Sequence, residues 1–353
     1  MLQFRLLKKR QETSHSATLF LDAGAEAISY EAGQFITLLF DHLGPKEIRR
    51  SYSLSSAPQE SDFSITVKQQ TNGVVSNYLV NDLAVGDSLL AFPPAGQFTL
   101  PNKTSIKDIL LFAGGSGITP LYSILKYALH YLPKSRIQLL YANRKEDSII
   151  FHAALNQLAK QHPNRLQIHH LLSNPNKKRP MTFSAANPIQ YLQGRASNDF
   201  LERWVKQAVG RRRKGVECFI CGPEGLMMKT RMTLKFMGLA EEQIHQEIFV
   251  IKGAKRPEAE DLVDSQVRLR WKEQVFDFGV KAGQTVLEGA KAAGIDLPYS
   301  CQSGVCTLCA SHCERGEVMM YTQQGQMNSK NMKGLALTCV GYPMTAKLDL
   351  VIE

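Results

Sequence analysis

The chain has 353 residues, of which 44% are hydrophobic, and a formal net charge of +10. This length is too great for one core of ordinary size and predicts two or three globular domains. No apolar run reaches the roughly 18 residues that span a bilayer, and the N-terminus lacks a signal peptide's apolar region, so we expect a cytoplasmic protein without membrane insertion. The basic runs 177–179 and 211–214 lack interleaved aromatic residues, which favours solvated loops over nucleic-acid binding.

The first hundred residues predict a small antiparallel β-barrel. Apolar and polar residues alternate over short runs such as 64–68 and 88–92, and Gly, Asn, Asp and Pro interrupt these runs. Residues 50–53 read Arg-Ser-Tyr-Ser. The arginine fork can pair with a phosphate and the tyrosine ring can cover a planar ligand. From the residues alone, an ordinary exposed strand explains this segment equally well.

From about residue 105, apolar strands alternate with amphipathic helices, which predicts an α/β domain with a parallel sheet. The first strand ends in a turn at 114–120 that reads Gly-Gly-Ser-Gly-Ile-Thr-Pro. Its glycines allow the backbone to approach a pyrophosphate at a helix N-terminus. Because Pro120 stands where a dinucleotide fingerprint has its third glycine, the turn argues against a Rossmann dehydrogenase.

Two later strand ends of this domain carry further candidates. Arg144 follows the second strand, where its cation can meet the 2′-phosphate of NADP, bind a pyrophosphate or cap a helix; NADPH is favoured, but NADH stays open. Cys218 and Cys221 have Cys-x2-Cys spacing. Their apolar surroundings and the absence of a second nearby pair in the sequence favour a buried strand over a metal or redox motif.

Four cysteines near the C-terminus give the strongest signal in the chain. Cys301, Cys306 and Cys309 read Cys-x4-Cys-x2-Cys, and Cys339 follows as a remote fourth, which is the spacing of a plant-type 2Fe-2S cluster. A zinc site usually pairs two short Cys-x2-Cys units. The three remaining cysteines argue against a disulfide framework and indicate a reducing compartment. Residues 263–353 hold nine basic and nine acidic side chains, so the positive excess precedes them.

Several of these segments together resemble the ferredoxin-NADP reductase superfamily joined to a plant-type ferredoxin. Arg-x-Tyr-Ser at 50–53, followed by Gly-x-x-Ser at 73–76, resembles its flavin site. Gly-x-Gly-Ile-x-Pro at 115–120 and Cys-Gly-Pro at 221–223 resemble its nucleotide domain, and residues 283–301 resemble the helix and cluster loop of ferredoxins. With the ferredoxin last, the order is similar to that of phenylacetyl-CoA epoxidase and ketosteroid hydroxylase reductases.

The resemblance implies an architecture, a set of cofactors and their binding residues. The implied parts are an FAD-binding barrel at 1–104, an α/β NAD(P)-binding domain at 105–251, a linker at 252–262 and a β-grasp ferredoxin domain at 263–353. FAD is favoured over FMN, with a 2Fe-2S cluster and NADPH or NADH. Cys221 is implied beside the nicotinamide, Thr119 at the flavin edge and Glu247 near the flavin. The other implied cofactor-binding residues are Arg50, Ser51, Tyr52, Ser53, Val67, Gly73, Val74, Ser76, Gly115, Ser116, Gly117, Arg144, Gly222 and Phe249; Cys301, Cys306, Cys309 and Cys339 are the implied cluster ligands.

These implications predict a reductase that passes electrons from NAD(P)H through FAD and the cluster to an oxygenase or hydroxylase. A flavin is needed because a nicotinamide gives two electrons at once and the cluster accepts one. Two alternatives stay open. The acceptor can be a fatty-acid desaturase or another carrier, or the chain can be a redox-sensing module without sustained turnover.

Overall fold

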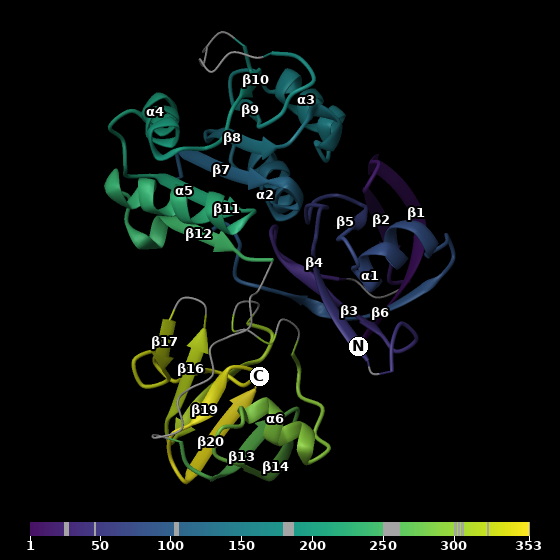
Figure 1. Ribbon diagram of the computed structural model, residues 1–353, viewed down its shortest axis with the longest axis vertical. Coiled ribbons are helices and arrows are strands. Elements are labelled where there is room, and N and C mark those ends of the chain that lie inside the picture. The colour runs from purple at the N-terminus through teal and green to yellow at the C-terminus, as the bar shows by residue number, and fades with distance from the viewer. Residues whose placement is uncertain are drawn as a thin grey trace. The chain divides into compact units, whose positions relative to one another are not determined.

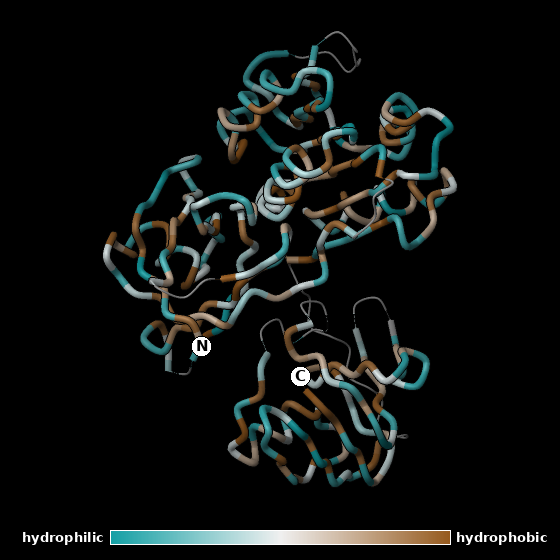
Figure 2. The backbone as a smooth tube through the Cα atoms, turned by 180° about the vertical axis from the view of Figure 1, so that it is seen from behind, coloured by the Kyte–Doolittle hydropathy of each residue, from teal (hydrophilic) through white to brown (hydrophobic). Residues whose placement is uncertain are grey.

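The computed structural model describes residues 1–24, 28–45, 47–101, 106–178, 187–249, 262–299, 302, 304, 307–322 and 325–352. The chain forms two compact units, Met1–Val250 and Ile251–Glu353 (Figure 1). The predicted linker 252–262 lies outside the described residues except for residue 262. Within each unit, hydrophobic residues gather on the inner strands (Figure 2). None of the helices in the described ranges has the length and apolar character that crossing a membrane requires.

The first unit begins with a six-stranded antiparallel sheet that closes into the predicted barrel. An antiparallel bridge between Leu54 and Ile65 joins the two ends of the strand order β4-β3-β6-β1-β2-β5. The helix α1 (Val74–Asn77) and a π-helical turn η1 (Tyr78–Asp82) follow the fifth strand. The strands are β1 (Leu2–Thr13), β2 (Ser16–Asp22), β3 (Phe35–Phe40), β4 (Ile48–Ser53), β5 (Phe63–Lys68) and β6 (Ser88–Ala95).

The rest of the first unit is the predicted parallel sheet with helices on both faces. Its strand order is β10-β9-β8-β7-β11-β12, and the order changes direction at β7, where open α/β sheets bind ligands beyond the carboxyl ends of their strands. The strands are β7 (Asp108–Gly114), β8 (Arg136–Asn143), β9 (Leu166–Leu172), β10 (Ile189–Gln193), β11 (Val216–Cys221) and β12 (Ile244–Glu247). The helices are α2 (Ile118–Tyr131), α3 (His152–Gln161), α4 (Asn198–Val209) and α5 (Glu224–Phe236), with short 3₁₀ turns η2 (Gly115–Gly117), η3 (Glu146–Ser148) and η4 (Glu241–Gln243).

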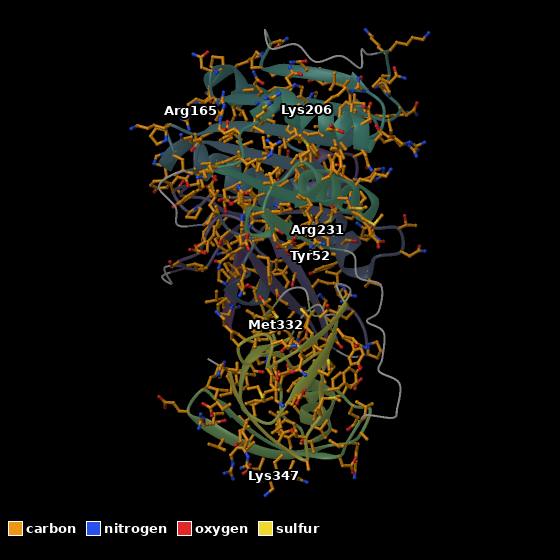
Figure 3. The ribbon with its side chains drawn as sticks, turned by 90° about the vertical axis from the view of Figure 1, so that its left-hand side faces the viewer. Tyr52, Arg165, Lys206, Arg231, Met332 and Lys347 are labelled. Carbon is orange, nitrogen blue, oxygen red and sulfur yellow. The ribbon has the colours of Figure 1, made fainter. Side chains whose placement is uncertain are left out.

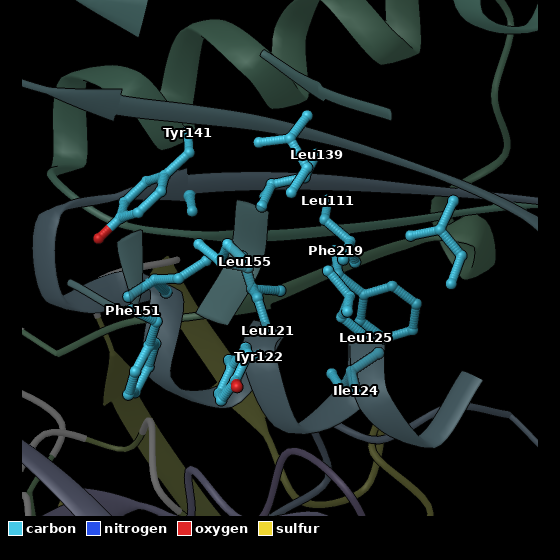
Figure 4. Packing of buried hydrophobic residues seen from close by; sticks show 14 of the residues in the cluster. Leu111, Leu121, Tyr122, Ile124, Leu125, Leu139, Tyr141, Phe151, Leu155 and Phe219 are labelled. Atoms are coloured by element: carbon cyan, nitrogen blue, oxygen red, sulfur yellow. The ribbon is translucent and has the colours of Figure 1, made fainter. Parts of the chain in front are cut away.

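Two apolar clusters cover the opposite faces of this sheet. On one face, Leu111 of β7 packs with Leu121 of α2 and Leu155 of α3 (Figure 4). On the other face, Phe112 lies edge-on to Trp204 of α4, with ring centroids 5.1 Å apart. Burial of both faces explains why these strands read as continuous apolar runs and not as alternating patterns.

The barrel packs directly against α2. Phe98, which follows the barrel strands, belongs to the same apolar cluster as Ile124 of α2. The Ser123 hydroxyl donates a hydrogen bond to the Ser56 carbonyl at 2.5 Å. Lys126, whose side chain is 12% exposed, forms an ion pair with Glu60 of the barrel. The barrel and the α/β domain are therefore one packed body.

The second unit has the predicted β-grasp architecture. A five-stranded sheet of order β14-β13-β20-β15-β18 has the parallel pair β13 and β20 near its centre, and a three-stranded sheet of order β17-β16-β19 lies beside it. The helix α6 (Val286–Ala292) begins at a capping box, in which Thr285 and Glu288 each bond the other's main-chain N–H. The strands are β13 (Ser265–Trp271), β14 (Gln274–Val280), β15 (Ala310–Arg315), β16 (Val318–Thr322), β17 (Gly325–Asn328), β18 (Leu335–Leu337), β19 (Gly341–Pro343) and β20 (Lys347–Ile352).

The buried carboxylate of Asp108 should contribute more to the free energy of unfolding than an exposed carboxylate does. Its carboxylate is 2% exposed and accepts hydrogen bonds from Arg136 and Arg212. Asp108→Asn should lower the free energy of unfolding by about 1–3 kcal/mol, because it removes the negative charge and replaces one of the two buried acceptor oxygens by a donor. Urea unfolding followed by Trp204 fluorescence, in a Trp271→Phe background, measures this loss. Asp199→Asn, which breaks an exposed pair, should cost less than about 1 kcal/mol, and equal losses would contradict the prediction.

Candidate active site and metal centre

The carboxyl ends of β7 and β11 bring two predicted motifs together. Cys221 lies opposite Ala113 in the parallel register, so the turns 114–117 and 221–223 are neighbours. A Cβ atom at Gly117 would lie 2.1 Å from the Cys221 carbonyl oxygen, and one at Gly222 would lie 2.9 Å from the Gly114 Cα. Both positions exclude a side chain. The two turns therefore pack backbone against backbone, which is the close approach that a glycine-rich nucleotide site needs.

Hydrogen bonds hold the glycine turn in one conformation. Gly115 has a φ of +53°, and its carbonyl accepts a 2.9 Å hydrogen bond from the Tyr141 hydroxyl on β8. The Thr119 hydroxyl donates to the Ser116 carbonyl at 3.0 Å. Burial raises the pKa of the Tyr141 phenol well above its ordinary value, so the group stays a donor. Tyr141 was not among the predicted site residues, because an apolar strand pattern carries no information about the partner of a hydroxyl.

The end of β5 brings a cation from the barrel to the same turn. The Lys68 Nζ lies 3.5 Å from the position that a Cβ of Gly115 would take. The Leu54–Ile65 bridge makes β4 and β5 neighbours, so the barrel edge that carries the predicted flavin residues lies beside the glycine turn (Figure 1). An ammonium group at this place can balance a phosphate. Lys68 was also missed, since it reads as the polar end of an alternating strand.

Strand β4 sorts the predicted flavin residues onto two faces. Arg50 and Tyr52 share one face because side chains alternate along a strand. Arg50 is exposed and Tyr52 is half-buried, and burial raises the pKa of the Tyr52 phenol. Ser51 lies on the opposite face, with its hydroxyl 2.8 Å from that of Thr37, and Ser53 is buried there. Arg50 and Tyr52 thus lie on the same face, where a guanidinium can pair with a phosphate and an aromatic ring can cover a planar ligand.

In the predicted phosphate loop before α1, the Ser76 side chain forms hydrogen bonds within the loop. The Ser76 hydroxyl accepts a hydrogen bond from the Gln70 N–H at 3.0 Å and donates one to the Gly73 carbonyl at 3.1 Å. The Val74 side chain is exposed, whereas Val67 is buried in the barrel core. The Gly73 N–H donates to the Gln70 carbonyl at 2.9 Å, so the main-chain donor that the loop can offer a phosphate is the Val74 N–H, at the start of α1, and the Ser76 hydroxyl shapes the loop.

Strand β12 places the predicted acidic residue beside the predicted cysteine. Glu247 lies opposite Cys221 in the register of β11 and β12. The Cys221 thiol is completely buried, and burial together with the Glu247 charge raises its pKa well above the ordinary value. Phe249, two residues further on, is 40% exposed. Cys218 is buried in the same strand as Cys221, as the sequence predicted.

Arg144 lies at the carboxyl end of β8, on the same edge of the sheet as the glycine turn. Its side chain is exposed and forms no ion pair with any residue in the described ranges. Its carbonyl accepts a 2.8 Å hydrogen bond from the Asn174 N–H, which anchors the main chain of the loop. The guanidinium therefore faces solvent at the edge where a nucleotide would bind.

The second unit brings two of the four predicted cluster ligands together. The sulfur atoms of Cys309 and Cys339 are 3.1 Å apart and buried, too far apart for a disulfide bond of about 2.05 Å. The Thr338 N–H donates to the Cys309 carbonyl at 3.0 Å, and the Leu287 N–H of α6 donates to the Thr338 carbonyl at 2.9 Å. Cys301 and Cys306 lie outside the described residues. Two converging soft thiols fit an iron–sulfur cluster.

Three models of known domain families match separate parts of the chain. Family models match an oxidoreductase FAD-binding domain at 4–100, an oxidoreductase NAD-binding domain at 111–232 and a 2Fe-2S iron-sulfur cluster binding domain at 270–344. The solved structure of phthalate dioxygenase reductase has the same fold, with a TM-score of 0.58 and 24% identity over 99% of this chain and 98% of that one. The protein is thus an oxidoreductase with FAD, NAD and 2Fe-2S domains.

Two curated relatives narrow the family. The ferredoxin reductase component of 3-ketosteroid-9-alpha-monooxygenase from Rhodococcus rhodochrous is 32% identical over 335 residues, 92% of this chain and 88% of the relative. A component of the 1,2-phenylacetyl-CoA epoxidase from Escherichia coli K12 is 29% identical over 332 residues, 93% of this chain and 89% of the relative. The chain belongs to this family of ferredoxin reductase components, and the predicted family, fold class and cofactors are confirmed.

Gly117→Ala tests the contact between the two turns. Its Cβ must displace the Cys221 main chain, so we expect the free energy of unfolding to fall by about 1–3 kcal/mol and the Kd for NAD⁺ to rise at least tenfold. Urea unfolding and an absorbance titration of the bound flavin measure the two effects. Gly225→Ala on α5 is the control; its Cβ meets no atom within 4 Å, and it should raise stability by about 0.4–1 kcal/mol. Unchanged nucleotide binding in Gly117→Ala would refute the contact's importance.

Tyr141→Phe tests the hydrogen bond that holds the turn. The change keeps the packing and removes one donor, so we expect the Kd for NAD⁺ to rise about 2- to 10-fold, which corresponds to about 0.5–1.5 kcal/mol. The FAD content should stay unchanged. Tyr127→Phe is the matched control, because the Tyr127 hydroxyl makes no hydrogen bond within the described part of the chain. Equal Kd values for the two variants would count against a role of the bond.

Proposed function

We propose that this reductase takes electrons from NAD(P)H and delivers them, through FAD and its 2Fe-2S cluster, to a separate oxygenase or hydroxylase protein. The observation that carries the proposal is the meeting of the turns 114–117 and 221–223 with the barrel edge of β4 and β5 inside one packed unit. The names of the relatives, which are components of a monooxygenase and an epoxidase, support this kind of acceptor.

One group of residues binds the flavin and its phosphates. When bound, FAD accepts two electrons as a hydride and supplies them singly to a cluster. Arg50 and Tyr52 bind the flavin from one face of β4, and the Val74 N–H, next to Gly73 at the start of α1, binds its phosphates. Lys68 balances phosphate charge at the glycine turn of Gly115, Ser116 and Gly117.

A second group orients the nicotinamide. Cys221 and Gly222 form the floor beside the ring, and the protonated Cys221 thiol keeps that floor neutral and dry. Thr119 holds the turn, Glu247 supplies the negative charge beside Cys221, and the exposed Phe249 ring covers a planar ligand.

Cys301, Cys306, Cys309 and Cys339 are the proposed cluster ligands. Cys309→Ser and Cys339→Ser should each remove most of the cluster's visible absorbance and lower the iron content per chain, since a serine oxygen is a poor soft ligand. Cys313→Ser is the matched control, because this partly exposed cysteine lies in β15, outside the ligand set. Full iron content in Cys339→Ser would reject the assignment.

Arg144 favours NADPH over NADH in this proposal, because its exposed guanidinium can bind the 2′-phosphate. The boundaries 1–104, 105–251, 252–262 and 263–353 are the proposed division into flavin domain, nucleotide domain, linker and ferredoxin domain. A cytoplasmic location is proposed from the cysteine content, which suits a reducing compartment.

The function is tested by anaerobic stopped-flow absorbance with NADPH and, separately, NADH. Loss of flavin absorbance followed by loss of the cluster bands supports the proposed electron path, and the faster nucleotide is the preferred one. Arg144→Gln should slow the reaction with NADPH and leave the reaction with NADH unchanged. Flavin reduction with an unchanged cluster, or no reduction at all, rejects the path; slow reduction without turnover of an added acceptor identifies a redox sensor.

A further inference from the structure

Helix α5 exposes a row of large apolar side chains to solvent. Met228, Met232 and Phe236 are 58%, 59% and 82% exposed, and their spacing of four residues puts them on one side of the helix. Met227 and Leu234 of the same helix are buried against the sheet. We call the three exposed residues the α5 stripe. The stripe is an outer surface, because the helix already has an apolar side that packs inward.

Basic side chains border the α5 stripe along the helix. Lys229 is exposed and forms no ion pair with a described residue, whereas Arg231 and Lys235 both pair with Glu241. The acidic Glu224 lies at the start of the helix. Two of these three cations thus share one carboxylate, and the third, Lys229, has no acidic partner among the described residues.

A basic loop continues this border at the end of the helix. Residues 211–214 read Arg-Arg-Arg-Lys, and the Arg213 Nε donates a 2.5 Å hydrogen bond to the carbonyl of Met237, next to Phe236. Arg211 and Lys214 are exposed and form no ion pair with a described residue, while Glu241 and Glu242, which follow α5 in the sequence, are exposed acidic residues. Figure 3 views the molecule from the side of α4 and α5 and labels Arg231. The loop adds positive charge where the stripe is most exposed.

The shape and charge of this surface decide what can occupy it. A stable protein interface buries about 800 Å² on each partner and involves roughly 20–30 residues, far more than one row of three side chains. A second copy of the chain would bring the same cations against these cations. An anionic bilayer accepts such a surface, because a row of apolar side chains on one helix enters the headgroup boundary while flanking Lys and Arg bind lipid phosphates.

We propose that the α5 stripe docks the reductase on the surface of an anionic lipid bilayer. Met228, Met232 and Phe236 enter the headgroup boundary, and Lys229, Lys235 and the loop 211–214 lie over the lipid phosphates. The contact is shallow and needs no membrane-spanning helix. It goes beyond the proposed function and does not depend on which protein accepts the electrons.

Vesicle flotation of the full-length holoprotein tests the proposal. The probes are vesicles of phosphatidylglycerol with phosphatidylcholine, and vesicles of phosphatidylcholine alone. We expect binding only to the anionic vesicles, with at least tenfold weaker binding for the triple variant Met228→Gln, Met232→Gln and Phe236→Gln. A control triple variant, Leu7→Gln, Val85→Gln and Leu90→Gln, removes exposed apolar side chains of the barrel and should bind like the wild type.

The charged border has its own pair of variants. Lys229→Gln should weaken binding to the anionic vesicles about fivefold, which corresponds to about 1 kcal/mol for one basic residue near such a surface. Lys134→Gln, which changes another exposed lysine, in the loop after α2, should bind like the wild type. Added salt should weaken the binding of the wild-type protein.

Four results would overturn the proposal. They are no binding of the wild type, equal binding of the stripe variant, concentration-dependent self-association that the stripe variant abolishes, and slower electron delivery to a protein acceptor by the stripe variant in the absence of vesicles. The last two would assign the stripe to a second copy or to a protein partner. Reduction of bound flavin by NAD(P)H is measured on every variant, so failure of the proposed function is seen separately from failure of vesicle binding.

Discussion

The contact between two turns at the carboxyl ends of β7 and β11 is the constraint on which the site depends. Gly117 and Gly222 leave no room for a Cβ atom, so the backbones of the two turns meet directly. The strand order makes β7 and β11 neighbours. The hydrogen bond from the Tyr141 hydroxyl to the Gly115 carbonyl then restricts the conformation of the glycine turn. The barrel then only has to present β4 and β5 to a surface that is already formed.

The sequence predicted the parts of the site whose chemistry lies in the residue type itself. Glycines at a strand end indicate a close backbone approach, and four spaced cysteines indicate a cluster, whatever the surrounding packing. Tyr141 and Lys68 were missed because their roles depend on which strand lies next to the glycine turn. Ser76 is a different case. The sequence predicted that it binds the cofactor, but in the structure its hydroxyl forms hydrogen bonds within its own loop.

The two sheets of the first unit were predictable from local sequence patterns, whereas the junction between them was not. Alternating and continuous apolar runs distinguished the barrel from the parallel sheet, because one face or both faces of the strands are buried. The junction between the barrel and the α/β domain was not predictable. It includes a hydrogen bond from the Ser123 hydroxyl to the Ser56 carbonyl and an ion pair between the partly buried Lys126 and Glu60 of the barrel. Such pairings carry no local pattern in one sequence.

The protonation state of Cys221 has a consequence for how the protein withstands its own chemistry. Reduced flavins in air pass electrons to oxygen and generate peroxide, and peroxide attacks thiolates far faster than thiols. Burial and the neighbouring Glu247 charge keep the Cys221 sulfur protonated and away from solvent. The cysteine proposed to lie beside the nicotinamide is therefore a poor target for peroxide, because it is neither a thiolate nor exposed to solvent.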